Sequence, residues 1–467
     1  LGDEAMKEKK INVGLASIPL IVVIILGLLS ATTWKAGMYV PLIGSIAAAG
    51  LVGVYLGKSW ETLQKGLVNG VSRALPALFI LVIVGAITGT WIQGGIIPTL
   101  IYYALEFISP AIFIPAACLV TAIIATSTGS SFTSIATIGL ALMATGLAMG
   151  FPPGLLAAAI ICGAFFGDSL SPLSDSTNLA SAMTGAGLFE AIGHMIHTAI
   201  PALLLSSIIY YFIAKPYASS MVGDSEMIDQ LLSGINNAFT ISPLLLLVLI
   251  AMIILTIKKV PALPTLILAT LLGGLCGFFV QGESLGAVIV AMSTGYVSNT
   301  GVEMVDRLLS SGGVASMAST VMLMTLATAL GGIMEEIGAL ECLVDKIMER
   351  VKGLGGLVAV TIFSGLVVAF ATGAQLLAII LPARMYAEEY KKRGLDPKNL
   401  ARIACQIGCV CITLVPWSVP TSYASGMFNV APAEFIPFLF FPMLLIVFNL
   451  LLGFTGISMT PLNKTEK

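Results

Sequence analysis

The sequence predicts an all-α polytopic membrane protein, and three observations support this prediction. Charged residues make up 10% of the 467-residue chain and hydrophobic residues 57%, whereas an ordinary soluble domain is about 25% charged. Apolar segments of about 20 residues, enough for a helix to cross a bilayer, recur along the whole chain. Only one long polar connection separates them, near the middle. The length therefore allows about ten to twelve crossings.

The composition also excludes several classes of function. So little charge argues against a nucleic-acid binder, a scaffold or a soluble enzyme, and the formal net charge of −2 suggests no charged macromolecular partner. The seven cysteines lie almost all in apolar runs, where cysteine acts as a small hydrophobe, and they imply no disulfide framework. We expect membrane lipids as partners, no enzymatic activity and no resident cofactor.

The chain divides at the central polar connection. We interpret residues 1–10 as an expression remnant before Met6 followed by a cytoplasmic N-terminus. The apolar stretch that follows is nearer 20 residues than the 7 to 15 of a signal peptide, so we expect the first membrane span there. The expected units are a first half at 11–215, a linker at 216–241, a second half at 242–457 and a tail at 458–467.

Short segments recur at a fixed spacing, which predicts an internal repeat. Gly89–Leu100 aligns with Gly332–Leu343 at an offset of 243 residues, and the polar stretch at Gly129 aligns with Thr372 at the same offset. At nearly that offset, a segment with two acidic residues beginning at Gly163 falls on an uncharged segment beginning at Ala404.

The basic residues of the loops predict that the two halves have opposite orientations. Lysine and arginine collect in short cytoplasmic loops, and here they alternate between corresponding loops of the two halves, while Lys7, Lys9 and Lys10 place the N-terminus in the cytoplasm. We therefore expect two inverted-topology repeats in the cell membrane, each with about five spans, a re-entrant hairpin and a broken helix. Twelve ordinary spans without re-entrant hairpins are the alternative interpretation.

The segment Gly163–Gly185 carries the clearest chemical signal. Asp168 and Asp175 stand between apolar spans, amid serines and a proline that break helices. Freed backbone groups at membrane depth are tolerated only where they line a protected or watery cavity, and carboxylate oxygens bind hard cations. We expect a discontinuous helix with a sodium site at both carboxylates; an ordinary polar loop is the alternative. Further candidate ligands are Ser171, Ser174, Thr177 and Asn178.

Two polar tips are candidate elements of the same site. Thr126–Ser134 has seven hydroxyl side chains in nine residues, and Thr372 and Gln375 occupy the parallel position in the second half. As hairpin tips they would offer neutral oxygens to a weakly held ion. Alternatively, the hydroxyls bond to carbonyls of their own helices, as is common in membrane proteins. The candidates at the first tip are Thr128, Ser130 and Thr133.

Other polar residues are weaker candidates. Glu336, next to Glu335 in an apolar helix, is a proton-linked candidate together with Asp168 and Asp175, although both glutamates are also consistent with a solvated helix end. His194 and His197 share one helix face and suit a pH sensor or a proton relay, but an interfacial polar stripe is the simpler interpretation. The cysteines at 405, 409 and 411 are interpreted as packing residues.

These motifs resemble a known family. The stretches Gly167–Ala180, Leu381–Arg402 and Leu414–Ser418 are similar to those of the NhaC-type sodium/proton antiporters of the ion-transporter superfamily, which includes malate/lactate antiporters. The resemblance implies an elevator-like carrier, a homodimer and an acidic ion pair at Asp168 and Asp175. The chain departs from the family's usual Glu-Asp pair after Arg402, where it has Cys405 and Gln406, and from the usual Asn after the tryptophan, where it has Ser418.

Two functions are consistent with these observations. The first is sodium/proton antiport by alternating access, with Na⁺ and H⁺ as the transported ions. The second is Na⁺- or H⁺-coupled antiport of small carboxylates or amino acids, since the neutral Gln406, beside Ser418, would suit an organic anion.

Overall fold

The computed structural model describes residues 10–34, 36–107, 109–221, 225–258, 260–302, 305–306, 309–348 and 353–462. These residues form helices and two isolated β-bridges. Seven of the described helices are long and apolar enough to span a membrane, and up to ten spans result if each bent pair counts as one. The prediction of an all-helical, multi-span membrane protein is therefore confirmed. Lys7 and Lys9, on which the expected N-terminal orientation rests, lie outside the described residues.

The first half of the chain contains the helices up to the central connection. Their bounds are α1 (Val13–Leu29), α2 (Tyr39–Tyr55), α3 (Trp60–Gln93), α4 (Ile96–Phe107), α5 (Pro110–Thr128), α6 (Ser131–Ser134), α7 (Leu140–Ala148), α8 (Pro153–Leu170), α9 (Asp175–Thr184), α10 (Leu188–Met221) and α11 (Ser225–Ala238). The expected linker is largely helical, because α10 continues past residue 215 and α11 follows it.

The second half contains α12 (Leu247–Ile257), α13 (Ala262–Phe279), α14 (Leu285–Thr294), α16 (Ala318–Glu336), α17 (Ala339–Met348), α18 (Gly353–Thr372), α19 (Gln375–Lys392), α20 (Pro397–Cys405), α21 (Val419–Phe428), α22 (Pro432–Phe435) and α23 (Phe440–Thr455). A π-helical turn, η5 (Gln406–Val410), and a 3-10 turn, η6 (Cys411–Leu414), extend α20 toward α21.

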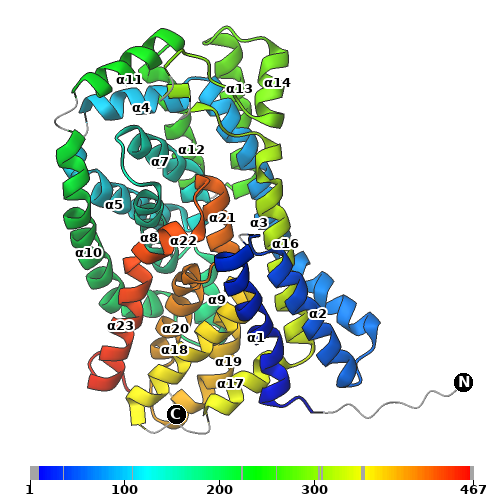
Figure 1. Ribbon diagram of the computed structural model, residues 1–467. Helices are drawn as coiled ribbons and strands as arrows, with labels where there is room; N and C mark the ends of the chain where they lie inside the picture. The colour runs from blue at the N-terminus through cyan, green and yellow to red at the C-terminus, as the bar shows by residue number, and fades with distance from the viewer. Residues whose placement is uncertain are drawn as a thin grey trace, which may run out of the picture.

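The helices form two groups that meet in the middle of the molecule (Figure 1). In the first group, α3 packs against α13, α14 and α16, with α2 alongside. In the second group, α5 packs against α8 and α10, and α18 packs against α19 and α23. α21 contacts α3 and α16 and so joins the second group to the first. α9, which contacts α19 and α20, lies near the centre of the view.

Three irregular points interrupt the second group. A left-handed glycine, Gly129 (φ 70°), separates α5 from α6, and Gly373 (φ 60°) separates α18 from α19 in the same way. The chain between α8 and α9, residues 171–174, leaves the helical conformation. Glycine adopts a positive φ without the steric cost that other residues incur, so both tight tips depend on it.

The first group is held by very close helix packing. A Cβ atom built on Gly70 of α3 would lie 2.2 Å from the carbonyl oxygen of Thr328 in α16, and one on Gly332 would lie 2.1 Å from the carbonyl oxygen of Gly66. Small residues let helix backbones approach in membranes, where van der Waals packing rather than hydrophobic burial drives association. α3 and α16 therefore form a rigid wall.

We predict that Gly70→Ala destabilises the protein by roughly 1–3 kcal/mol, because the added methyl group forces these helices apart. Gly193→Ala in α10 is the matched control, since nothing lies within 4 Å of its built Cβ; it should be neutral or stabilising by up to about 1 kcal/mol. Thermal unfolding of the detergent-purified protein measures both. Equal melting temperatures for the two variants would contradict the close packing.

Candidate functional site

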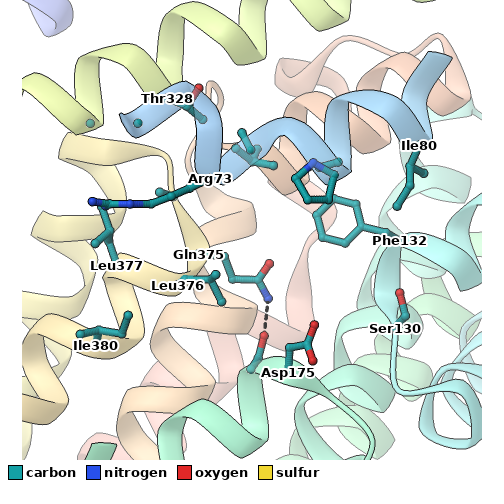
Figure 2. Close-up of a pocket in the computed structure, with 18 of the residues that line it drawn as sticks. Arg73, Ile80, Ser130, Phe132, Asp175, Thr328, Gln375, Leu376, Leu377 and Ile380 are labelled. Atoms are coloured by element: carbon teal, nitrogen blue, oxygen red, sulfur yellow. Dashed lines mark hydrogen bonds between the residues drawn. The ribbon is translucent and has the colours of Figure 1, made fainter. Parts of the chain in front are cut away.

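A cavity of about 800 Å³ lies between the two groups of helices. α3 and α16 form one wall, while the tip at Gly129, the start of α9 and the first turns of α19 form the other. Figure 2 shows Arg73 and Ile80 of α3 on one side, facing Asp175 and Gln375 on the other.

Asp168, in the last turn of α8, joins the first tip to the interrupted helix. Its side chain is 5% exposed but contributes to the cavity lining. The Oδ2 atom accepts hydrogen bonds from the backbone N–H and the hydroxyl of Ser131, at 3.2 and 2.6 Å, and Oδ1 accepts one from the hydroxyl of Ser174 at 2.5 Å. Hydrogen bonds to an ionised group are the strong ones, so this carboxylate fixes the relative position of three segments.

The start of α9 is built by local capping. The Ser174 hydroxyl accepts from the N–H groups of Ser176 and Thr177, at 3.2 and 3.4 Å, as N-cap serines do. The Thr177 hydroxyl donates to the carbonyls of Asp168 and Ser169, freed where α8 ends. Asp175 is the first residue of α9 and is exposed to the cavity, where the positive end of the helix dipole favours its negative charge.

Gln375, the first residue of α19, connects the second half of the chain to the start of α9. Its Nε2 donates to the hydroxyl of Ser176 at 2.9 Å and contacts Cys409 Sγ at 3.1 Å. The bond to Ser176 is dashed in Figure 2, where Gln375 lies beside Asp175. Asp168, Asp175, Ser130 and Gln375, predicted from three separate segments of sequence, therefore line one cavity.

The other hydroxyl candidates mostly bond to their own segments. Thr372 donates to Val368 O, Thr128 contacts Ala125 O and the Ser134 hydroxyl, and Thr133 bonds to the capping Ser130. Ser171 and Asn178 fasten the interrupted stretch: the former accepts from Leu173 N, and the latter donates to the carbonyls of Pro172 and Ser174. These residues shape the tips and the break.

Gln406 and Ser418 lie outside the cavity lining. The Gln406 Oε1 accepts from the hydroxyl of Thr198 and the amide of Asn449, and its Nε2 donates to the Met195 carbonyl. Ser418 caps α21 by accepting from Thr421 N at 3.3 Å. Both side chains are completely buried, so they fasten helices of the second group together.

Of the paired glutamates, Glu335 rather than Glu336 lines the cavity. Arg73 Nη1 lies 2.5 Å from Glu335 Oε2, which makes an ion pair between α3 and α16. Arg384 of α19 also lines the cavity. Neither arginine stands out in the sequence as a candidate site residue; the available signal for Arg384 was a basic residue directly after the apolar first half of α19.

The two histidines form a separate cluster with the C-terminal segment. His194 Nε2 lies 2.8 Å from the carbonyl of Ser458, and His197 Nδ1 lies 2.9 Å from its hydroxyl. The buried Arg402 donates to the same carbonyl at 3.3 Å. Within the described part of the chain, no group of three or more His, Cys, Asp or Glu side chains is arranged to hold a metal ion.

Two helix groups, tips that turn at glycines and an interrupted helix around a carboxylate-lined cavity are typical of multi-span membrane proteins that transport small ions or solutes. The model of the Na⁺/H⁺ antiporter family matches residues 9–177 and 163–457. The chain belongs to this family, whose members are secondary transporters rather than enzymes, and the resemblance inferred from its motifs is confirmed.

Characterised relatives show the range of the family. The chain is 33% identical to the Na⁺/H⁺ antiporter NhaC of Alkalihalophilus pseudofirmus, over 97% of both chains. It is 33% identical to the malate-2H⁺/Na⁺-lactate antiporter of Bacillus subtilis, over 87% of this chain and 86% of the relative. It is 30% identical to the arginine/ornithine antiporter ArcD of Halobacterium salinarum, over 97% of this chain and 94% of the relative.

We predict that Ser174→Ala destabilises the protein more than Ser418→Ala does. Each substitution removes an N-cap, a contribution of about 1 kcal/mol, but only Ser174→Ala also removes a hydrogen bond to a carboxylate, a contribution of about 1.5–3 kcal/mol. Thermal unfolding of the two purified variants measures the difference. Equal melting temperatures would contradict the hydrogen bond between Ser174 and Asp168.

Proposed function

We propose that the protein exchanges Na⁺ for H⁺ across the cell membrane, with Asp168 and Asp175 binding the two ions in turn. The observation that carries this proposal is a pair of carboxylates at one helix break, both lining a cavity between two helix groups. A carboxylate inside a membrane protein is costly and is retained for function. Membership of the Na⁺/H⁺ antiporter family supports the same assignment.

The oxygen atoms around Asp168 suit a sodium ion that competes with a proton. The hydroxyls of Ser131 and Ser174 donate to the carboxylate in this structure, but a hydroxyl also carries two lone pairs and can rotate to present them. With Na⁺ bound, both hydroxyls would serve as ligands beside the carboxylate. A proton on Asp168 removes the negative charge that holds Na⁺, so one ion displaces the other.

Alternating access between two inverted repeats would carry the ions across. The helix bounds support such a repeat: α3 and α16 end at Gln93 and Glu336, 243 residues apart, and α9 and α21 begin 244 residues apart. Thr177 donates to the carbonyl of residue 169, and Thr421 donates to that of residue 413, again 244 residues away. The wall of α3 and α16 would be static and the second helix group mobile.

The same proposal includes the orientation of the two halves in the membrane and the oligomeric state of the protein. The halves at 11–215 and 242–457 would run in opposite directions, with re-entrant hairpins at Gly129 and Gly373. Lys10, Lys58 and Lys65 would face the cytoplasm. The family resemblance implies a homodimer.

A second candidate function is Na⁺- or H⁺-coupled antiport of small carboxylates or amino acids. The observation that favours it is the size and apolar character of the cavity, which at about 800 Å³ exceeds what a cation needs. The names of two relatives, a malate/lactate antiporter and an arginine/ornithine antiporter, are consistent with it. Uptake of labelled malate, lactate and arginine into proteoliposomes, with and without a Na⁺ gradient, distinguishes it from simple ion exchange.

We predict that Asp175→Asn and Asp168→Asn reduce Na⁺-driven H⁺ movement to the rate of empty liposomes, since each removes a charge that holds the ions. The measurement is the response of an internal pH dye in proteoliposomes after addition of Na⁺. Glu388→Gln is the control, because Glu388 is an exposed acid of α19 outside the cavity lining, and it should retain the wild-type rate. No pH change in the wild type on adding Na⁺ would overturn the proposal.

The proposed orientation predicts which surface residues a membrane-impermeant thiol reagent reaches. Glu283→Cys, which follows α13, should be labelled in intact cells, whereas Lys391→Cys, at the end of α19, should be labelled only after permeabilisation. The wild-type protein is the control for native thiols, five of which are buried. Labelling of both variants in intact cells would rule out this topology.

A further inference from the structure

The cavity has room for more than a cation. Its volume of about 800 Å³ compares with about 30 Å³ for one water in the liquid, and it falls within the roughly 300–1,000 Å³ of small-molecule sites. Ala77 and Ile80 line it from α3, and Leu376 and Ile380 line it from α19. A sodium ion gains nothing from such surfaces, but the carbon chain of an organic solute does.

One cationic side chain in this cavity has no hydrogen-bond or ion-pair partner among the residues that the structure describes. Arg384 is exposed and lines the cavity, and no hydrogen bond or ion pair joins it to another residue that the structure describes. Other arginines are engaged: Arg73 pairs with Glu335, and Arg393 pairs with Glu389. An ionisable side chain within a membrane protein calls for a functional partner, and for a guanidinium that partner is an anion.

The position of Arg384 connects it to the cation site. Leu376, Ile380 and Arg384 are spaced four residues apart and therefore share one face of α19. Arg384 lies about 13 Å along the helix axis from Gln375, at 1.5 Å per residue. The Cα–Cβ bonds of a helix tilt toward its N-terminus, which in α19 is the end that carries Gln375. The interval between Arg384 and Gln375 is bounded by apolar side chains and suits a solute of a few carbon atoms.

We propose that Arg384 binds the carboxylate of a small organic anion in this cavity, with the carbon chain along Leu376 and Ile380. The planar guanidinium matches a carboxylate with two parallel hydrogen bonds, a geometry that lysine does not offer. The inference rests on the proposed function in taking this cavity as the transport site. It places the anion at a residue distinct from Gln406 and Ser418, which the sequence favoured.

The apolar walls make the proposal specific to organic anions. An inorganic anion such as chloride would meet the guanidinium but leave Leu376, Ile380 and Ile80 without a partner. Each additional buried methylene group of a ligand favours binding by about 0.8 kcal/mol in area terms, so affinity should rise from acetate to propionate and butyrate.

Thermal unfolding of the purified protein, at constant Na⁺, tests this site directly with acetate, propionate, butyrate and chloride. We expect butyrate and propionate to raise the melting temperature in a concentration-dependent way, and acetate and chloride to do so less. Arg384→Gln should raise the half-maximal concentration of the anion about ten- to hundredfold, as expected for loss of a charge-assisted hydrogen bond. Arg384→Lys should recover part of the lost affinity. Lys392→Gln, which removes an exposed charge from the same helix outside the cavity lining, should match the wild type.

Three results would overturn the inference: no response of the wild type to propionate or butyrate, the same response in Arg384→Gln, or an equal response to chloride. The melting temperature of Arg384→Gln without ligand shows whether the variant is folded, and Arg384→Lys provides the second variant if it is not. Na⁺-driven pH change in the wild type without organic anion tests the proposed ion exchange separately. Carboxylate binding that depends on Arg384 in a protein without that exchange would retain this inference and remove the ion-exchange proposal.

Discussion

The interrupted helix between α8 and α9 is held by one connected set of hydrogen bonds: Asp168 accepts from the hydroxyls of Ser131 and Ser174, and Ser174 in turn caps the start of α9. In the absence of bulk water, every unpaired backbone group at membrane depth costs several kcal/mol, so a break survives only when side chains satisfy it. Ser174 and Thr177 provide this by capping the start of α9 and the end of α8. The same contacts place a carboxylate, two hydroxyls and the first tip together. The hydrogen bonds that satisfy the helix break are therefore the same ones that assemble the site.

The sequence predicted the parts of the site that follow from local chemistry. Asp168, Asp175 and the tip at Ser130 stand out because polar residues interrupt apolar runs, and the structure brings them to one cavity. Gln406, in contrast, lies outside the cavity lining. It bonds to Thr198 and Asn449 of distant helices, and the spacing of residues in the sequence does not reveal such a pairing. Arg384 was missed for a related reason, since its lack of a partner is visible only once α19 is packed against the cavity.

Each helix group contains a pair of helices that pack too closely for an added methyl group. In the first group, α3 and α16 approach through Gly70 and Gly332; in the second, a Cβ atom built on Gly163 of α8 would lie 2.1 Å from the carbonyl oxygen of Cys118 in α5. Close packing of this kind transmits force without deforming. The second group also turns sharply at Gly129 and Gly373, where φ is positive. The cavity lies between the two groups, an arrangement consistent with two rigid bodies that move relative to one another, as the proposed function requires.

The two halves share a backbone plan but not its charges, and this difference explains coupling in the proposed exchange. At the 244-residue offset, Ser174 and Thr177 correspond to Ser418 and Thr421, which form matching caps, whereas Asp168 and Asp175 correspond to Ile412 and Val419. In the proposed mechanism, the mobile group would therefore carry the carboxylates of the ion site at one break only. An uncompensated carboxylate costs several kcal/mol in a low-dielectric environment, so the group would cross readily only with Na⁺ or H⁺ bound. Net transport of Na⁺ in one direction would then require returns with H⁺ bound, because the empty, charged form would be the state that the membrane disfavours.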